Sequence, residues 1–119
     1  MKPTTDIALD WAIRCFGNEH VYNKPIRSLR IAEEAIELAQ AFDVPKDKML
    51  ALVEMVYSRP KGHPQQEIGG VMMTTTVLCA AMGMDADDAF QVELRRVLAK
   101  SADHFAKRNQ EKIDLGMTA

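Results

Sequence analysis

The sequence predicts an all-α protein in which about four to five helices form a bundle. Ala, Leu, Glu and Met, which favour helices, are abundant, and eight of the 119 residues are Met. The alternation of β-branched and polar residues that would indicate strands is missing. A chain of this length suits one domain, so we expect a single all-α domain over residues 1–119.

Turn-forming residues divide the chain into five predicted helices. Gly, Pro, Asn and Asp gather at residues 17–18, 23–25, 43–45, 59–64 and 83. The predicted helices span about residues 5–16, 26–42, 46–58, 64–82 and 87–112. Pro45 suits the first turn of the third helix, and Asp85 can cap the fifth. The connections are short, as in an antiparallel bundle.

The predicted second helix carries the strongest functional signal. At about 100° per residue, its polar arc holds the side chains of Arg30, Glu33, Glu34 and Glu37. Apolar residues occupy the opposite side. One interpretation is a solvated acidic stripe on an amphipathic helix. The other is a cation site, because Mg²⁺ prefers carboxylate oxygens and bridges them to phosphates.

The predicted fourth helix begins with another carboxylate. Glu67 opens a segment that has no further charge until Asp85, and it shares a helix face with apolar residues. A carboxylate at a buried position needs a partner. Alternatively, the positive end of the helix stabilises Glu67 in the first turn. Gly69 and Gly70 lack side chains, which would allow the carboxylate helix to approach closely.

These two segments together resemble the all-α pyrophosphohydrolase superfamily, which includes MazG and the dimeric dUTPases. That family carries EExxE, followed on a later helix by ExxD. Glu33, Glu34 and Glu37 match the first motif, and Glu67 matches the Glu of the second, but Gly70 stands where the family has Asp. The segment 56–72 looks like a small, partly phage-borne MazG-like branch. The resemblance covers about residues 11–112.

The resemblance implies a hydrolase that cleaves a nucleoside triphosphate to the monophosphate and pyrophosphate with Mg²⁺, or with Mn²⁺ in its place. Glu34, Glu37 and Glu67 match the metal ligands, and Glu33 matches the residue that acts on the attacking water. Gly70 supplies no ligand, so water or another acid would fill that position. A purine deoxynucleotide such as dGTP is slightly favoured, and the implied role is control of the nucleotide pool.

Four basic residues are candidates for substrate binding. Arg30 stands where many relatives have a Lys, and Lys100 resembles the family's phosphate-contacting Lys on the last helix. Arg96 lies one helical turn before Lys100 and would contact the same pyrophosphate. Arg59, in the loop before Glu67, is a weaker candidate. The alternative for the last helix is a solvated face of mixed charge.

Composition restricts the partners and the location. The net charge is −2, so a general nucleic-acid-binding role is not expected. The uncharged stretch 68–84 is shorter than the ~20 residues that span a bilayer, and we interpret it as a buried core helix of a cytoplasmic protein. Cys15 and Cys79 are interpreted as buried thiols, Trp11 as a core or interface residue, and the three His as surface or loop residues.

The resemblance also implies assembly as a dimer or a dimer of dimers. The apolar third and fourth helices favour such a homodimer or homotetramer. Two alternative functions stay open. One is a catalytically weakened relative that binds a nucleotide or a protein partner without turnover, which the glycine at position 70 motivates. The other is a helical interaction module whose acidic face is only solvated.

Overall fold

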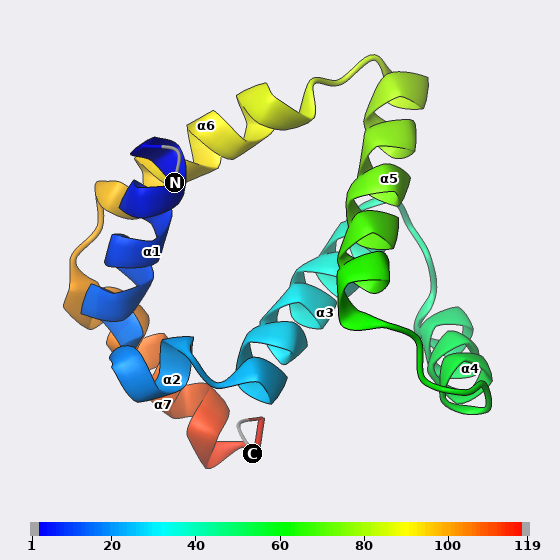
Figure 1. The fold of residues 1–119 in the computed structure, drawn as a ribbon, viewed down its shortest axis with the longest axis horizontal. Coiled ribbons are helices and arrows are strands. Elements are labelled where there is room, and N and C mark those ends of the chain that lie inside the picture. The colour runs from blue at the N-terminus through cyan, green and yellow to red at the C-terminus, as the bar shows by residue number, and fades with distance from the viewer. Residues whose placement is uncertain (1–2, 118–119) are drawn as a thin grey trace. The chain divides into compact units, whose positions relative to one another are not determined.

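A computed structural model describes residues 3–117, and these residues form helices and turns without a strand (Figure 1). The helices are α1 (Pro3–Phe16), α2 (Asn18–Val21), α3 (Lys24–Ala41), α4 (Lys46–Tyr57), α5 (Pro64–Met82), α6 (Ala86–Leu98) and α7 (Ala102–Asp114). The prediction of an all-α protein is confirmed. The predicted count of four to five helices is too low, because α2 and the division between α6 and α7 were not expected.

Local chemistry sets the ends of the first three helices. Gly17, at φ 84°, has a backbone conformation that favours glycine and separates α1 from α2. The side chain of Asn23 caps α3, because its Oδ1 accepts a hydrogen bond from the Ile26 N–H at 3.1 Å. Pro25 then lies in the first turn of α3, where no intrahelical N–H is needed. The predicted breaks at residues 17–18 and 23–25 are confirmed.

The helices α4 and α5 lie within one residue of their predicted bounds. Asp43 has φ 65°, and the N–H of Val44 donates to the carbonyl of Ala39 at 3.0 Å, which ends the preceding helix. Pro45 and Pro64 stand at the starts of α4 and α5. Gly83 ends α5 in the left-handed conformation, at φ 67°.

The predicted helix over residues 87–112 is wrong as a single element. The helix α6 ends at Leu98, and the hydroxyl of Ser101 accepts a hydrogen bond from the His104 N–H at 3.3 Å to cap α7. A side-chain cap of this kind competes with continuation of the helix. Lys100 consequently lies between α6 and α7, so the predicted basic stripe from Arg96 through Lys100 does not run along one helix.

The chain divides into two compact units. Unit 1 consists of Met1–Val44 and Arg96–Ala119, and unit 2 consists of Pro45–Arg95. Unit 1 therefore holds α1, α2, α3 and α7, whereas unit 2 holds α4, α5 and most of α6. The expectation of one domain over residues 1–119 stays a prediction.

The core of unit 1 forms where α1 packs against α7. Cys15, Val97 and Phe105 are its buried residues, and Trp11 and Phe16 pack against them. The Trp11 and Phe105 rings meet edge to face, with centroids 5.1 Å apart. Trp11 is thus a core residue, as predicted, and burial raises the pKa of the Cys15 thiol. Cys79, in contrast, is only partly buried.

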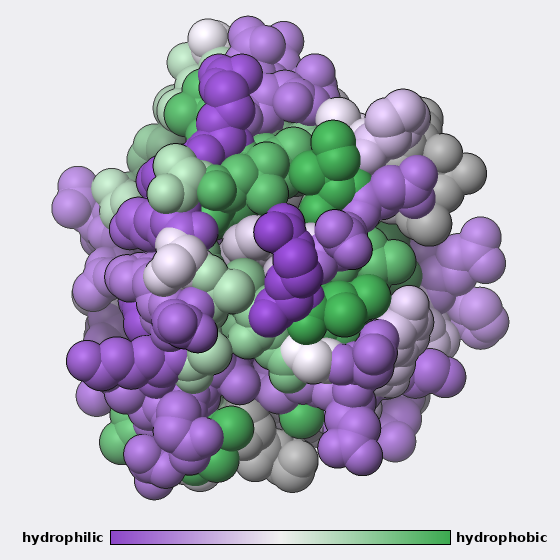
Figure 2. Space-filling model, turned by 90° about the vertical axis from the view of Figure 1, so that its left-hand side faces the viewer, coloured by the Kyte–Doolittle hydropathy of each residue, from purple (hydrophilic) through white to green (hydrophobic). Residues whose placement is uncertain are grey.

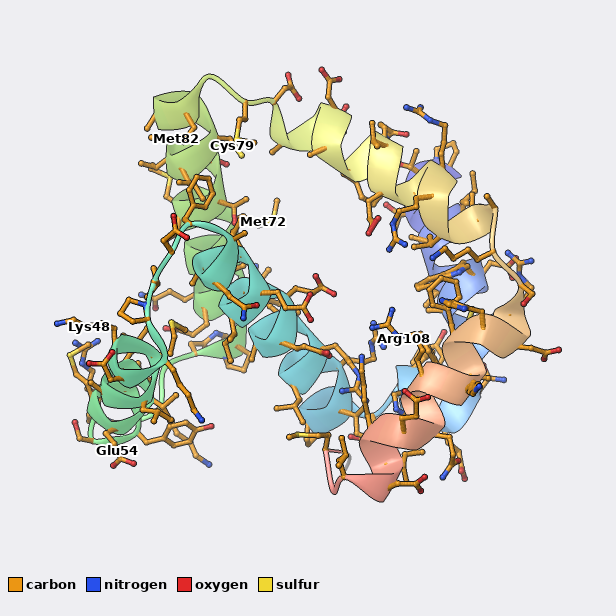
Figure 3. The ribbon with its side chains drawn as sticks, turned by 180° about the vertical axis from the view of Figure 1, so that it is seen from behind. Lys48, Glu54, Met72, Cys79, Met82 and Arg108 are labelled. Atoms are coloured by element: carbon orange, nitrogen blue, oxygen red, sulfur yellow. The ribbon has the colours of Figure 1, made fainter. Side chains whose placement is uncertain are left out.

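In unit 2, neither α4 nor α5 has a buried residue, so the interpretation of 68–84 as a buried core helix is wrong for this chain. Met73 exposes 66% of its surface and Ile68 exposes 62%. Figure 3 labels Met72, Cys79 and Met82 along α5. Figure 2 views the side on which α1 and α7 lie in Figure 1, and hydrophobic side chains reach the surface there too, between hydrophilic ones. Large exposed apolar areas of this kind mark interaction surfaces.

Within residues 3–117, no helix is by itself long and apolar enough to cross a bilayer. Only α5 and α6 taken together reach that length and hydropathy, and they are bent by 104° at their junction. Two of the three Thr hydroxyls in the middle of α5 donate to backbone carbonyls of their own helix. Thr75 donates to Val71 and Thr76 donates to Met72, both at 2.8 Å.

Candidate functional site

The three carboxylates predicted on one helix face lie on α3 in unit 1. Glu33 is partly buried, whereas Glu34 and Glu37 are exposed. The apolar side of α3 is also largely exposed, with 46% of Ile36 accessible. Glu33 is drawn into contacts with another helix, because Lys112 of α7 donates to it.

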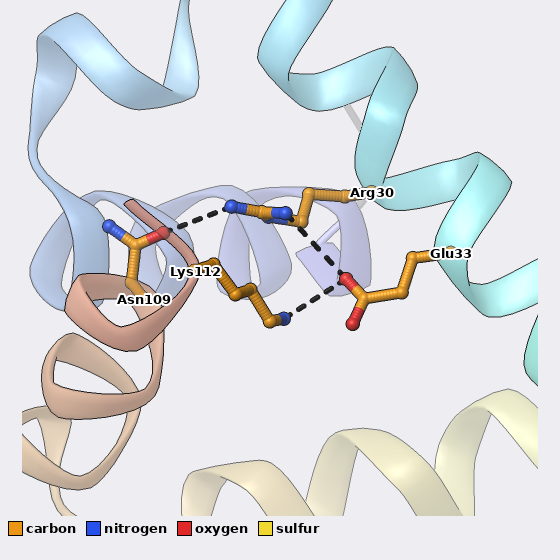
Figure 4. Close-up of polar contacts among 4 residues, drawn as sticks. All are labelled: Arg30, Glu33, Asn109 and Lys112. Atoms are coloured by element: carbon orange, nitrogen blue, oxygen red, sulfur yellow. Dashed lines mark hydrogen bonds and ion pairs between the residues drawn. The ribbon is translucent and has the colours of Figure 1, made fainter. Parts of the chain in front are cut away.

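Two cations hold Glu33 (Figure 4). The Lys112 Nζ of α7 lies 3.0 Å from Glu33 Oε1, and the Arg30 Nη1 lies 3.7 Å from the same oxygen. The Nη2 of Arg30 also donates to the Asn109 Oδ1 at 3.2 Å. We call these four residues the Glu33 cluster. Exposed fractions of 14% for Arg30 and 28% for Lys112 leave the ion pairs partly shielded from water, which strengthens them relative to surface pairs.

The geometry of the Glu33 cluster leaves one carboxylate oxygen available. Both cation contacts are made to Oε1, and within residues 3–117 no hydrogen bond to Oε2 is found (Figure 4). With two cations and one carboxylate, the cluster has a net positive charge. It can therefore orient a water at Oε2 and accept an anionic group beside it.

The four basic candidates predicted from the sequence did not include Lys112. Asn109 and Lys112 are three residues apart on α7, and Arg30 and Glu33 are three residues apart on α3. Residues at this spacing share a helix face. The spacing was readable in the sequence, but it does not show which faces of α3 and α7 meet.

The predicted fourth carboxylate, Glu67, lies in the first turn of α5 in unit 2. Its Oε1 lies so close to Gly62 that a Cβ at that position would overlap it. This placement at the helix start agrees with stabilisation by the positive end of the helix. Arg59 is exposed in the turn after α4, also in unit 2.

The two basic residues predicted on the last helix are exposed. Arg96 lies near the end of α6, and Lys100 lies beyond that end, where its N–H donates to the carbonyl of Val97 at 3.2 Å. The predicted geometry of a Lys and an Arg one turn apart on a common helix is thus not observed. Lys112 of α7 is the amine that the structure brings to Glu33.

The carboxylates have the chemistry that suits a hard cation, because Glu34 and Glu37 present oxygens on one face of α3. Among residues 3–117, no three His, Cys, Asp or Glu side chains already converge as a metal-binding group. A Cβ at Gly69 or Gly70 would meet no atom within 4 Å, so no contact of the described chain requires glycine there.

Comparison of the chain with protein-family models, with curated proteins and with solved structures gave no match. The proposed function therefore rests on the chemistry of the Glu33 cluster and on the motif resemblance.

Proposed function

We propose that this chain is a Mg²⁺-dependent pyrophosphohydrolase that cleaves nucleoside triphosphates to monophosphate and pyrophosphate. The observation that supports this most directly is the α3 face, where Glu34 and Glu37 accompany a Glu33 held by Arg30 and Lys112. Hydrolysis at the α-phosphorus needs an oriented water and compensation of the phosphate charge. Carboxylates beside cations meet both needs, and the EExxE motif of the MazG-like family supports the same reaction.

Each residue has a proposed role in this reaction. Glu34 and Glu37 of α3 are the proposed ligands, and the family resemblance alone adds Glu67; bound Mg²⁺, or Mn²⁺ in its place, would neutralise phosphate oxygens. Glu33 takes a proton from the attacking water through Oε2. Lys112 acts as a positioning residue, because it fixes Oε1 of that carboxylate.

The substrate contacts follow from charge. Arg30 lies beside Glu33 and is proposed to contact a phosphate oxygen near the attacked centre. Arg96 and Lys100 are proposed to contact the leaving pyrophosphate, and Arg59 is a further candidate. We propose a deoxynucleotide substrate, with a purine such as dGTP slightly preferred, and a role in nucleotide-pool control in the cytoplasm. The family resemblance supports these last assignments.

The partner that we propose is a second copy of the chain, in a homodimer or a homotetramer. The helices α4 and α5 support self-association, because they have no buried residue although both are rich in large apolar side chains. Burial of such surface contributes about 25 cal/mol per Å². A second copy that covered these helices would therefore stabilise the pair.

The test of the reaction is pyrophosphate release from each dNTP in the presence of Mg²⁺. Wild-type protein should release pyrophosphate, and Glu37→Gln should lower the rate at least about tenfold, because loss of a carboxylate weakens the metal site. Glu54→Gln is the matched control, since Glu54 is an exposed carboxylate on α4 in unit 2 (Figure 3). Absence of release at high enzyme concentration with every dNTP would refute the proposal.

A second candidate function is nucleotide binding without turnover. The glycine at position 70 favours this function, because the MazG-like family has a carboxylate, that of Asp, at the corresponding position. Saturable binding of a dNTP without any pyrophosphate release would establish it.

A third candidate function is a helical interaction module, which the exposed α4 and α5 favour. In that case Mg²⁺ should leave the thermal stability of the protein unchanged.

A further inference from the structure

A second group of polar and aromatic side chains surrounds the Phe16 ring in unit 1. The Trp11 ring meets it edge to face at a centroid distance of 5.7 Å, and the His20 ring lies 5.6 Å away at a tilt of 37°. The guanidinium carbon of Arg27 lies over the same ring, 5.7 Å from its centroid. We call these four residues the Phe16 cluster; it joins α1, α2 and α3.

The Phe16 cluster contains buried nitrogens without partners. Both ring nitrogens of His20 and the Nε1 of Trp11 are shielded from solvent, and none has a hydrogen-bond partner among residues 3–117. Buried polar atoms without partners are rare and costly in native proteins. The prediction that His20 is a surface or loop residue is consequently wrong, since its ring packs on Phe16.

The cluster also carries unbalanced positive charge. Arg27 is partly buried, and within residues 3–117 its guanidinium has neither a carboxylate nor a hydrogen-bond acceptor. Burial and then the charge of Arg30 lower the pKa of Arg27. Glu33 does not compensate Arg27, because its contacts are with Arg30 and Lys112. The described residues around Arg27 therefore supply no anion to balance its charge.

We propose that Arg27 and His20 form a binding site for a phosphate group, with Arg30 at its edge. A guanidinium offers two parallel N–H donors to two phosphate oxygens, and the imidazole adds a third donor. The charge of about −1.5 to −2 on a phosphate group at neutral pH offsets the two neighbouring arginines. This site uses no carboxylate of α3, and Arg30 is the one residue that it shares with the site proposed for hydrolysis.

Phosphate could come from a free inorganic ion or from a nucleotide. The test is a titration of the full chain with inorganic phosphate, pyrophosphate or dGTP in EDTA, which prevents turnover. Trp11 is the only Trp of the chain and contacts Phe16, so its fluorescence reports on the cluster. We expect a saturable change in fluorescence, and sodium chloride of equal ionic strength should not reproduce it.

The variants Arg27→Gln and His20→Gln should each weaken binding at least about tenfold, as expected for loss of a charge-assisted hydrogen bond. Arg27→Lys, which keeps the charge but not the paired donors, should bind with intermediate affinity. Arg14→Gln is the matched control, because Arg14 is an exposed arginine of α1 that pairs with Asp10. Circular dichroism verifies the fold of each variant, and His20→Gln replaces Arg27→Gln if the latter does not fold.

The outcomes separate the ligand sources. Binding of all three ligands identifies any phosphate group as the ligand, binding of dGTP alone identifies a nucleotide, and binding of the inorganic ions alone identifies free phosphate. The proposal is overturned if no ligand gives saturation or if the folded variants bind as tightly as wild type. Phosphate binding without pyrophosphate release from dNTPs refutes the hydrolase but not this site. Hydrolysis with unchanged binding in the variants refutes this site but not the hydrolase.

Discussion

Single residues of the Glu33 cluster explain why one carboxylate of α3 differs from its neighbours. Glu34 and Glu37 are exposed, whereas Glu33 receives Lys112 at 3.0 Å and Arg30 at 3.7 Å on the same oxygen. A carboxylate held on one oxygen presents the other in a defined direction. This arrangement favours Glu33 as the group that acts on a water.

Removal of the Lys112 amine tests this role at the residue scale. In Lys112→Gln the Oε1 of Glu33 loses its closest cation, so pyrophosphate release should fall about tenfold through kcat, because the water is less well oriented. Lys107→Gln, at an exposed lysine of the same helix, should retain full activity. Equal rates for Lys112→Gln and wild type would show that the Lys112 contact is only structural.

The second residue-scale prediction concerns pH. Burial, then Arg30 and Arg27, lowers the pKa of His20 below 6.5 in the folded protein. The unfolded chain therefore takes up this proton first, and the free energy of unfolding should decrease as pH falls from about 6.5 towards the folded pKa. Above that window the contribution of His20 is constant.

Urea unfolding between about pH 8 and about pH 5 measures this effect. His20→Gln should reduce the loss of stability at acid pH, because the variant has no group to titrate at this position. His63→Gln, in the exposed loop before α5, is the control and should follow the wild-type curve. A His20→Gln curve that parallels wild type throughout would contradict the assignment.

At the scale of elements, short-range hydrogen bonds determine where helices start and stop. Asn23 caps α3, Gly83 ends α5, and Ser101 caps α7. The Ser101 cap has the largest consequence, because it separates α7 from α6. The separation allows α7 to pack on α1 and brings Lys112 to Glu33.

Loss of the Ser101 cap should be measurable as a loss of stability. Ser101→Ala leaves the His104 N–H without its acceptor and should lower the free energy of unfolding by about 1 kcal/mol. Ser58→Ala removes only an exposed hydrogen bond, from the Ser58 hydroxyl to the Met55 carbonyl at the end of α4, and should change it by less than about 0.5 kcal/mol. If the two variants are equally stable in urea unfolding, the cap does not stabilise α7.

At the scale of the whole molecule, the two compact units differ in how they bury apolar surface. Unit 1 has a core around Cys15, Val97 and Phe105. In unit 2, α4 and α5 expose most of their large apolar side chains. A helix that is apolar on several sides must bury those side chains against another surface, and the proposed second copy would supply that surface.

The measured mass in solution tests this self-association. Light scattering after size exclusion should give a multiple of the 13.3 kDa chain mass, corresponding to a dimer or a tetramer. Met72→Glu should shift the protein towards the monomer, because a charge would be buried in the interface. Lys107→Glu is the control, since it places the same carboxylate at an exposed position of α7 in unit 1, outside the two helices proposed to be covered. A monomeric wild type at micromolar concentration would contradict the proposal.

The sequence by itself determined the all-α class, most helix bounds and the common face of Glu33, Glu34 and Glu37. These features depend on neighbours within about four residues along the chain, where Pro, Gly, Asn and the helical period act directly. The break at Ser101 is also local, but helix-favouring residues on both sides concealed it. Only the tertiary structure decided that Lys112 pairs with Glu33 and that Arg27 and His20 surround Phe16. Those contacts depend on which helix faces pack together, and many alternative packings satisfy the same amphipathic pattern.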